Sequence, residues 1–294
     1  MSRRAWVAFA VMAVVWGLPY LFMRVAVSEV SPVFVAWSRL TIAAVLLLPL
    51  AASRGVLASA RGKLPWIVLL AAFYMALAFT MLPLAETVLP SSLSAIVIAG
   101  VPIVVTLLGL RSERPSATRV AGLALGFAGV GALVGFDIGV RPAQLLALGA
   151  LAVVLVSYAF GPLLTRSRLQ TVHPLAVSGL TSGTASLLLT PALLFQLPRH
   201  VPSEPVLLSL LGLGVLCSVV AFVTWFFLIQ EAGPARATVV PYVNPVVGVV
   251  AGALVLHERI GPGAVVGMAL ILAGSWLATT GRTLRFRALR ALSV

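Results

Sequence analysis

Long apolar runs, separated by short polar breaks, follow one another along the whole chain. Each run has 17 to 24 residues, enough for a helix rising about 1.5 Å per residue to cross a hydrocarbon core of about 30 Å. The runs are apolar on all sides, without the alternation of barrel strands. The sequence therefore predicts an all-α integral membrane protein with ten transmembrane helices, at Trp6–Met23, Pro32–Ala52, Leu64–Leu84, Ser91–Leu110, Val120–Phe136, Gln144–Leu164, Pro174–Leu197, Val206–Ile229, Val239–Leu256 and Pro262–Thr279.

Composition agrees with a chain that faces lipid. Of 294 residues, 61% are hydrophobic and 9% charged, whereas a soluble domain is about 25% charged. The net charge of +13 raises the question of a nucleic-acid partner, but the basic residues stand one to four at a time between apolar runs, as in the loops of membrane proteins. We expect no nucleic acid, no metal and no cofactor, because Cys217 is the single cysteine and the three histidines are scattered.

The N-terminus has two interpretations. Arg3 and Arg4 precede the first apolar run, which is also the order found in a signal peptide. The run is long enough to span the bilayer, and no convincing small-residue cleavage site ends it. We interpret it as a first span that is kept.

The distribution of basic residues predicts the orientation. With a cytoplasmic N-terminus, 15 of the 20 Lys and Arg residues fall in inner segments and 4 in outer loops, while Arg39 lies inside a span. Positive residues favour the cytoplasmic side. Both termini of this multi-pass protein are therefore expected on the cytoplasmic side, with a basic cytoplasmic tail over 282–294.

The two halves of the chain align with each other. At an offset of 142 residues, Arg24 pairs with Arg166 and Pro32 with Pro174; at 145, Gly122 pairs with Gly267. A unit of five spans is odd, so its repeat must enter the membrane in the opposite orientation. We expect two inverted five-helix repeats, over 6–136 and 144–281, which is an architecture of secondary transporters.

These features resemble the EamA-domain members of the drug/metabolite transporter superfamily. The resemblance covers about residues 6–281 and is carried by Trp16-Gly17, by Arg39, and by Pro245 followed by Glu258-Arg259, Gly267 and Gly274. The first half departs in spacing, since Pro102 and Glu113 are only eleven residues apart. The resemblance implies a transporter of the bacterial inner membrane that moves small organic metabolites, amino-acid-like or drug-like and often exported. It does not name the substrate.

Two alternatives to a transporter stay open at this point. One is a membrane enzyme acting on lipid or isoprenoid substrates, although no cluster of acids or nucleophiles supports catalytic residues. The other is a membrane scaffold that transports nothing.

Helix-breaking residues mark the expected hinges. Proline removes a backbone hydrogen bond, which a membrane helix tolerates where it faces a cavity or a neighbouring helix. Such residues recur at comparable places in both halves, and common use of Pro and Gly in membrane helices is the alternative. The predicted hinge residues are Gly17, Pro19, Pro102, Gly161, Pro162, Pro241 and Pro245.

Polar and aromatic side chains at comparable depth define the expected substrate site. A buried Tyr or Trp offers a flat apolar face together with a polar atom that seeks a partner. The predicted binding residues are Trp16, Tyr20, Arg39, Tyr74, Tyr158, Tyr242 and Asn244. Arg39 is the one charge firmly inside a span, with carbonyls, aromatic faces or an anionic substrate group as expected partners and snorkelling to the interface as the alternative.

Two further features have a structural interpretation. Gly122 with Gly129, and Gly267 with Gly274, lie seven residues apart on one helix face and predict close helix packing, with association into a homodimer as the second interpretation. The acids fall at or beyond the span ends, so no proton relay is evident; Glu86 is the exception to watch, because a slightly longer third span would include it.

Overall fold

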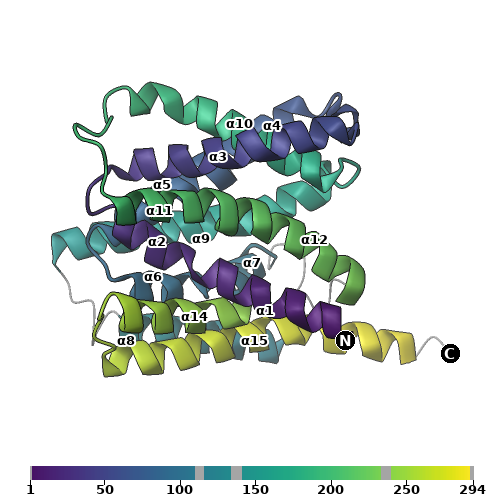
Figure 1. The fold of residues 1–294 in the computed structure, drawn as a ribbon. Helices are drawn as coiled ribbons and strands as arrows, with labels where there is room; N and C mark the ends of the chain where they lie inside the picture. Colours follow the sequence, from purple (N-terminus) through teal and green to yellow (C-terminus); the bar gives the residue numbers. More distant parts are fainter. Residues whose placement is uncertain (1, 110–115, 134–140, 233–239, 292–294) are drawn as a thin grey trace.

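The computed structural model describes residues 2–109, 116–133, 141–232 and 240–291, and every regular element in these ranges is helical. The helices lie side by side and run between the same two ends of one bundle (Figure 1). Loops 27–31, 87–90, 194–203 and 256–261 lie at one end, which we call the Glu258 end. The N-terminus and loops 54–63 and 169–173 lie at the other end.

The first half contains helices that follow the predicted spans closely: α1 (Arg3–Gly17), α2 (Pro19–Ala26), α3 (Pro32–Ser53), the 3₁₀ turn η1 (Val56–Ala60), α4 (Leu64–Leu70), the π-helix η2 (Ala71–Leu77), α5 (Ala78–Glu86), α6 (Ser91–Ile98), α7 (Val101–Gly109) and α8 (Ala117–Leu133). The second half contains α9 (Pro142–Arg168), α10 (Pro174–Leu193), α11 (Glu204–Leu211), the π-helix η4 (Gly212–Val220), α12 (Ala221–Ala232), α14 (Val240–Val255) and α15 (Pro262–Ala291).

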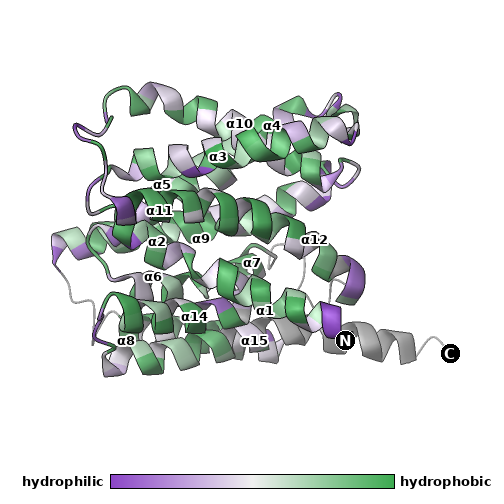
Figure 2. Cartoon of the chain, in the orientation of Figure 1, coloured by the Kyte–Doolittle hydropathy of each residue, from purple (hydrophilic) through white to green (hydrophobic). Residues whose placement is uncertain are grey.

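Seven of the described helices are long and apolar enough to cross a membrane: Arg3–Ala26, Pro32–Ser53, Leu64–Glu86, Ser91–Leu108, Pro142–Arg168, Pro174–Leu193 and Glu204–Ala232. Three shorter apolar helices, Ala117–Leu133, Val243–Val255 and Pro262–Leu277, fall where the remaining spans were predicted. Hydrophobic residues cover the middle of the bundle and hydrophilic ones gather at its two ends (Figure 2). The protein is therefore a multi-pass membrane protein, and ten remains the predicted number of spans.

Some boundaries differ from the predicted ones. The third span continues to Glu86 instead of ending at Leu84, and the seventh ends at Leu193 instead of Leu197. Helix α15 runs on to Ala291, so much of the predicted tail is helical. Residues 134–136 of the fifth predicted span lie outside the described part of the chain.

Proline at the first helical position starts several of these helices. Pro32, Pro142 and Pro174 each follow a residue with extended backbone, because proline fixes φ and has no N–H to leave unpaired. Ser31 completes the start of α3, since its hydroxyl accepts a hydrogen bond from the N–H of Phe34 at 3.2 Å. Local sequence thus determines where these spans begin.

Glycine holds α8 and α15 together. A Cβ atom on Gly274 would lie 2.6 Å from the carbonyl oxygen of Gly122, and one on Gly129 would lie 2.9 Å from that of Gly267. Such distances leave no room for a side chain. Both predicted glycine pairs therefore pack against each other within the chain.

The other close helix pairs also join the two halves. Helix α3 packs against α10, α6 against α14, α5 against α9, and α1 against both α12 and α14. The residues of the predicted site come from α1, α2, α3, η2, α9 and α14, so this packing decides which of them meet.

Candidate functional site

Arg39 is buried inside the bundle and does not extend to its surface. Its side chain is 7% exposed, and its guanidinium donates from Nε to Ser218 Oγ at 3.0 Å and from Nη2 to the carbonyl oxygen of Cys217 at 3.2 Å. The guanidinium carbon lies 4.2 Å from the centre of the Phe79 ring, a distance suited to a cation–π contact. A carbonyl and an aromatic face are among the partners that the sequence predicted.

A chain of aromatic rings continues from Arg39. The Phe79 and Tyr158 ring centres lie 6.5 Å apart, edge to face, and those of Tyr158 and Tyr74 lie 5.6 Å apart. A Cβ atom on Gly161 would lie 2.1 Å from Tyr74 Cδ2, so Tyr74 rests directly on the backbone of that glycine. The structure therefore brings together Arg39, Tyr74 and Tyr158 of the predicted binding residues, with Phe79 between them. We call these four residues the Arg39 cluster.

Two π-helices position this cluster. Tyr74 lies on η2, while Cys217 and Ser218 lie on η4; Ser218 Oγ in turn donates to the carbonyl of Leu213 at 2.9 Å, five residues earlier. A π-helix shifts the backbone ladder and often marks a functional site. Sequence reasoning missed Phe79, Cys217 and Ser218, because no apolar period distinguishes a π-helical turn from an α-helical one.

Tyr20, Gly17 and Asn244 meet where the first span crosses α14. A Cβ atom on Gly17 would lie 3.0 Å from the carbonyl oxygen of Asn244, and one on Gly248 would lie 3.2 Å from Tyr20 Cδ2. No donor among the described residues reaches the buried Oδ1 of Asn244. A buried amide oxygen without a partner is costly, so this atom can accept a hydrogen bond from a further donor.

Trp16 lies apart from the Arg39 cluster. Its ring centre is 4.9 Å from that of Trp225, and both belong to a separate apolar group that includes Met12 and Leu228. The structure thus pairs Trp16 with another tryptophan. Tyr242 belongs to α14, but its side chain lies outside the described part of the structure.

The predicted hinges divide into two groups. The first span is interrupted at Leu18, between Gly17 and Pro19, and the fourth at residues 99–100, just before Pro102. In contrast, α9 continues through Gly161 and Pro162, and α14 continues through Pro245 with Pro241 in its first turn. The expected interruption is absent at these four positions, and motion at any of the seven stays a prediction.

Glu258 joins the two halves at the Glu258 end. Its carboxylate accepts hydrogen bonds from Ser91 N–H at 2.8 Å, Ser91 Oγ at 2.9 Å and Ser92 N–H at 3.0 Å, and so caps α6. His257 takes a positive φ of 53°, and a Cβ atom on Gly252 would lie 2.6 Å from Glu258 Oε2.

Partial burial alone would raise the pKa of Glu258, but the bonds from Ser92 and Ser91 outweigh it and hold the pKa below its ordinary value. The carboxylate therefore stabilises the start of a helix from the other half, α6. Glu113, its predicted counterpart, lies outside the described residues.

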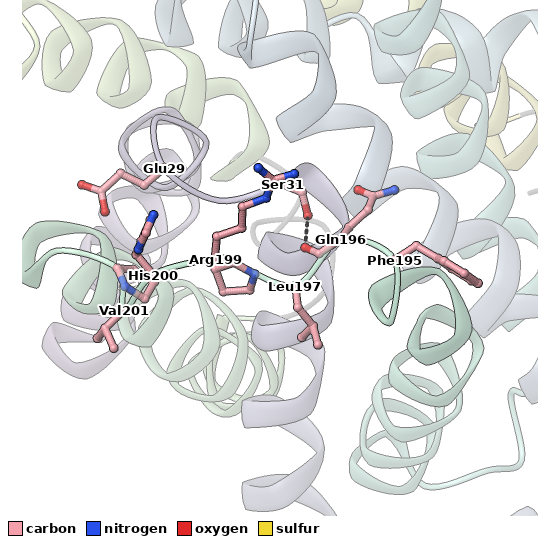
Figure 3. A pocket seen from close by; sticks show the side chains of 10 residues that line it. Glu29, Ser31, Phe195, Gln196, Leu197, Arg199, His200 and Val201 are labelled. Atoms are coloured by element: carbon pink, nitrogen blue, oxygen red, sulfur yellow. Dashed lines mark hydrogen bonds between the residues drawn. The ribbon is translucent and has the colours of Figure 1, made fainter.

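A second carboxylate, that of Glu29, joins loop 27–31 to loop 194–203 at the Glu258 end. Glu29 accepts hydrogen bonds from the hydroxyl and the N–H of Ser203, which hold the pKa of Glu29 below its ordinary value. Beside it lies a surface pocket of about 550 Å³, lined by Glu29, Ser31, Arg199, His200 and neighbours in loop 194–203 (Figure 3). None of the predicted binding residues lines this pocket.

The residues described above are suited to binding a small molecule. They offer the hydrogen-bond donors of Arg39, the unpartnered acceptor of Asn244 and the aromatic faces of the Arg39 cluster. Among the described residues, no three His, Cys, Asp or Glu side chains converge as metal ligands would. The protein is a multi-pass membrane protein, and a buried cation beside aromatic rings inside its bundle of apolar helices fits the transporter class.

The chain belongs to the EamA-like transporter family, whose model matches it twice, over residues 4–135 and 145–280. Each match covers one of the two predicted halves.

Several relatives are similar over most of their length. A probable terminal-alkyne amino-acid exporter of Streptantibioticus cattleyicolor is 30% identical over 284 residues, which are 94% of this chain and 93% of the relative. An uncharacterized transporter of Archaeoglobus fulgidus is 25% identical over 95% of this chain and all of the relative. The uncharacterized inner membrane transporter YedA of Escherichia coli is 28% identical over 81% of this chain and 78% of its own. A crystal structure at 20% identity shares the fold, with a TM-score of 0.68 over 97% of this chain and 99% of the other.

Proposed function

We propose that this protein exports a small organic metabolite with an anionic group across the inner membrane, by alternating access between two inverted five-helix halves. The Arg39 cluster is the observation that carries the proposal. A guanidinium is costly inside a membrane protein, and here it lies among neutral partners. Five N–H groups are available on an arginine, and two are used by Ser218 and Cys217.

The packing of the halves supports an inverted repeat over 6–136 and 144–281. Helices α3 and α10, α6 and α14, and α8 and α15 pair the second, fourth and fifth spans with their counterparts. Between the third and sixth spans, α5 contacts α9. Between their counterparts, the eighth and first spans, α12 contacts α1 and α11 contacts α2. The two π-helices, which begin at Ala71 and Gly212, also occupy corresponding places in the third and eighth spans. A twofold-related scaffold of this kind is what rocking about a central site requires.

The chemistry of the cluster indicates the class of substrate. A planar guanidinium binds a carboxylate through two parallel hydrogen bonds, while the Tyr74 and Tyr158 rings suit an apolar side chain. Outside the cluster, where the first span crosses α14, Asn244 Oδ1 supplies an acceptor for an ammonium or hydroxyl group. An amino acid with an apolar side chain meets all three demands, and the Streptantibioticus relative is named for an exporter of such compounds.

Metabolite profiling tests the proposal without assuming one substrate. We expect cells that overproduce the protein to lose an amino-acid-like anion from the cytoplasm and to accumulate it in the medium. In a parallel experiment the cells are given propargylglycine, an amino acid with a terminal alkyne. Cells that overproduce the protein should then hold less propargylglycine than cells that do not. The control overproduces Arg39→Gln at equal membrane abundance. Profiles that do not differ between the wild type, Arg39→Gln and empty cells would contradict the proposal.

A further inference from the structure

The carboxyl group of Glu86 is the one fully buried acid among the described residues. Glu86 ends α5 and has none of its surface exposed. No donor among the described residues lies within hydrogen-bond distance of Oε1 or Oε2. A carboxylate without a donor is strongly disfavoured in an apolar interior, whereas the neutral acid is tolerated.

The charges around Glu86 are engaged elsewhere. Arg24 of α2 donates from Nη1 to the backbone carbonyl of Glu86, not to its carboxylate. Glu258 is held by Ser91 and Ser92 and is itself an acid. Arg39 of α3 is bound to η4. The remaining titratable groups on the packed elements are the tyrosines Tyr20 on α2, Tyr74 on η2 and Tyr158 on α9; α6 contributes serines. Helix α9 also carries Arg166 and Arg168, but in its last turn, at the opposite end of the bundle from Glu86.

The position of Glu86 connects the surface with the proposed substrate site. The next residue, Thr87, is exposed at the Glu258 end. On the inner side, Tyr20 and Tyr158 lie within electrostatic range of the Glu86 carboxyl, and Arg39 lies within range of both tyrosines. A change of charge at Glu86 therefore changes the electrostatic potential at the proposed substrate site.

We propose that Glu86 is a proton-binding site, loaded and emptied from the Glu258 end of the bundle, that couples proton movement to transport. In the conformation described here the carboxyl holds the proton. When this end opens, water reaches the group, the O–H bond breaks, and the proton passes to water and leaves a hydrated carboxylate that can accept another. The coupling rests on the proposed transport function; the proton site itself does not.

Infrared spectroscopy of the purified protein in lipid tests the site without any substrate. We expect a carbonyl stretch of a protonated carboxyl group at neutral pH, lost in Glu86→Gln and moved but kept in Glu86→Asp. The band should shift in D₂O without unfolding, because the proton exchanges with water, and it should fade as the pH is raised. Glu29→Gln is the matched control: Glu29 is exposed and bonded to Ser203, so its loss should leave the band in place.

Three results would overturn the inference. A spectrum in which Glu86→Gln removes no protonated-carboxyl band means that Glu86 carries no proton. A band that neither shifts in D₂O nor fades with pH means a permanently buried structural acid. Loss of the band when Na⁺ replaces K⁺ means a cation site. If the band behaves as expected and profiling finds no export, the proton site stands and the proposed function fails.

Discussion

Arg39→Gln should insert and fold normally but lose most export of the metabolite identified by profiling. The neutral amide cannot form the charge-assisted pair with an anionic group, a contribution of about 1.5–3 kcal/mol for a hydrogen bond to a charged group. At about 1.4 kcal/mol per factor of ten, the export rate should fall roughly ten- to a hundredfold. Arg39→Lys should retain part of the rate, because an ammonium group keeps the charge but lacks the planar fork. Initial export rates from cells with matched membrane abundance measure both.

Arg54→Gln provides the matched control for Arg39. It removes the same charge from the exposed end of the same helix, and we expect export to be unchanged. A normal rate in Arg39→Gln would show that Arg39 only anchors α3 to η4, and the substrate site would have to be sought elsewhere.

Gly274→Ala should destabilise the protein strongly. The added Cβ atom would lie 2.6 Å from both the Gly122 carbonyl oxygen and the Gly126 nitrogen, which are backbone atoms that cannot turn aside. Overpacking of this kind typically costs about 1–3 kcal/mol, and here α8 and α15 must separate to relieve it. Thermal unfolding in detergent, followed by the loss of monodisperse protein, should show a clearly lowered midpoint.

Gly131→Ala is the control for Gly274→Ala. No atom lies within 4 Å of a Cβ at Gly131, and alanine favours a helix over glycine by up to about 1 kcal/mol. We expect an unchanged or raised midpoint. If both variants unfold alike, the close contact between α8 and α15 is not a feature of the folded protein, and the glycines would again be available for association between protomers.

Much of the fold could be predicted because lipid leaves few choices. Continuous apolar runs must be helical, and proline after a polar residue starts α3, α9 and α10 close to the predicted positions. The length of an apolar run does not specify the residue at which its helix ends. Glu86 was expected just beyond the third span, yet one more half-turn makes it the last residue of α5 and buries it.

The site was less predictable, because the contacts depend on helix rotation and on backbone irregularities. Gly161 was expected to break a helix, but its lack of a side chain serves to seat Tyr74. Trp16 was expected beside the substrate, whereas its nearest described ring is that of Trp225. Arg39 could be singled out by its charge alone, while its partners Ser218 and Cys217 depend on a π-helical turn that periodicity does not reveal.

Cysteine labelling from outside the cell most directly tests the central claim of two oppositely inserted halves. Single cysteines are introduced into a Cys217→Ser background, since Cys217 is buried and is the only native thiol. An impermeant thiol reagent should label intact cells at Ser28→Cys in the first half and at Val201→Cys in the second. It should not label them at Ser59→Cys or Gln170→Cys, the positions 142 residues from Val201 and Ser28, which should react only after the cells are opened. Labelling of Ser28→Cys and Gln170→Cys alike, with Ser59→Cys and Val201→Cys both protected, would contradict the opposite insertion of the two halves.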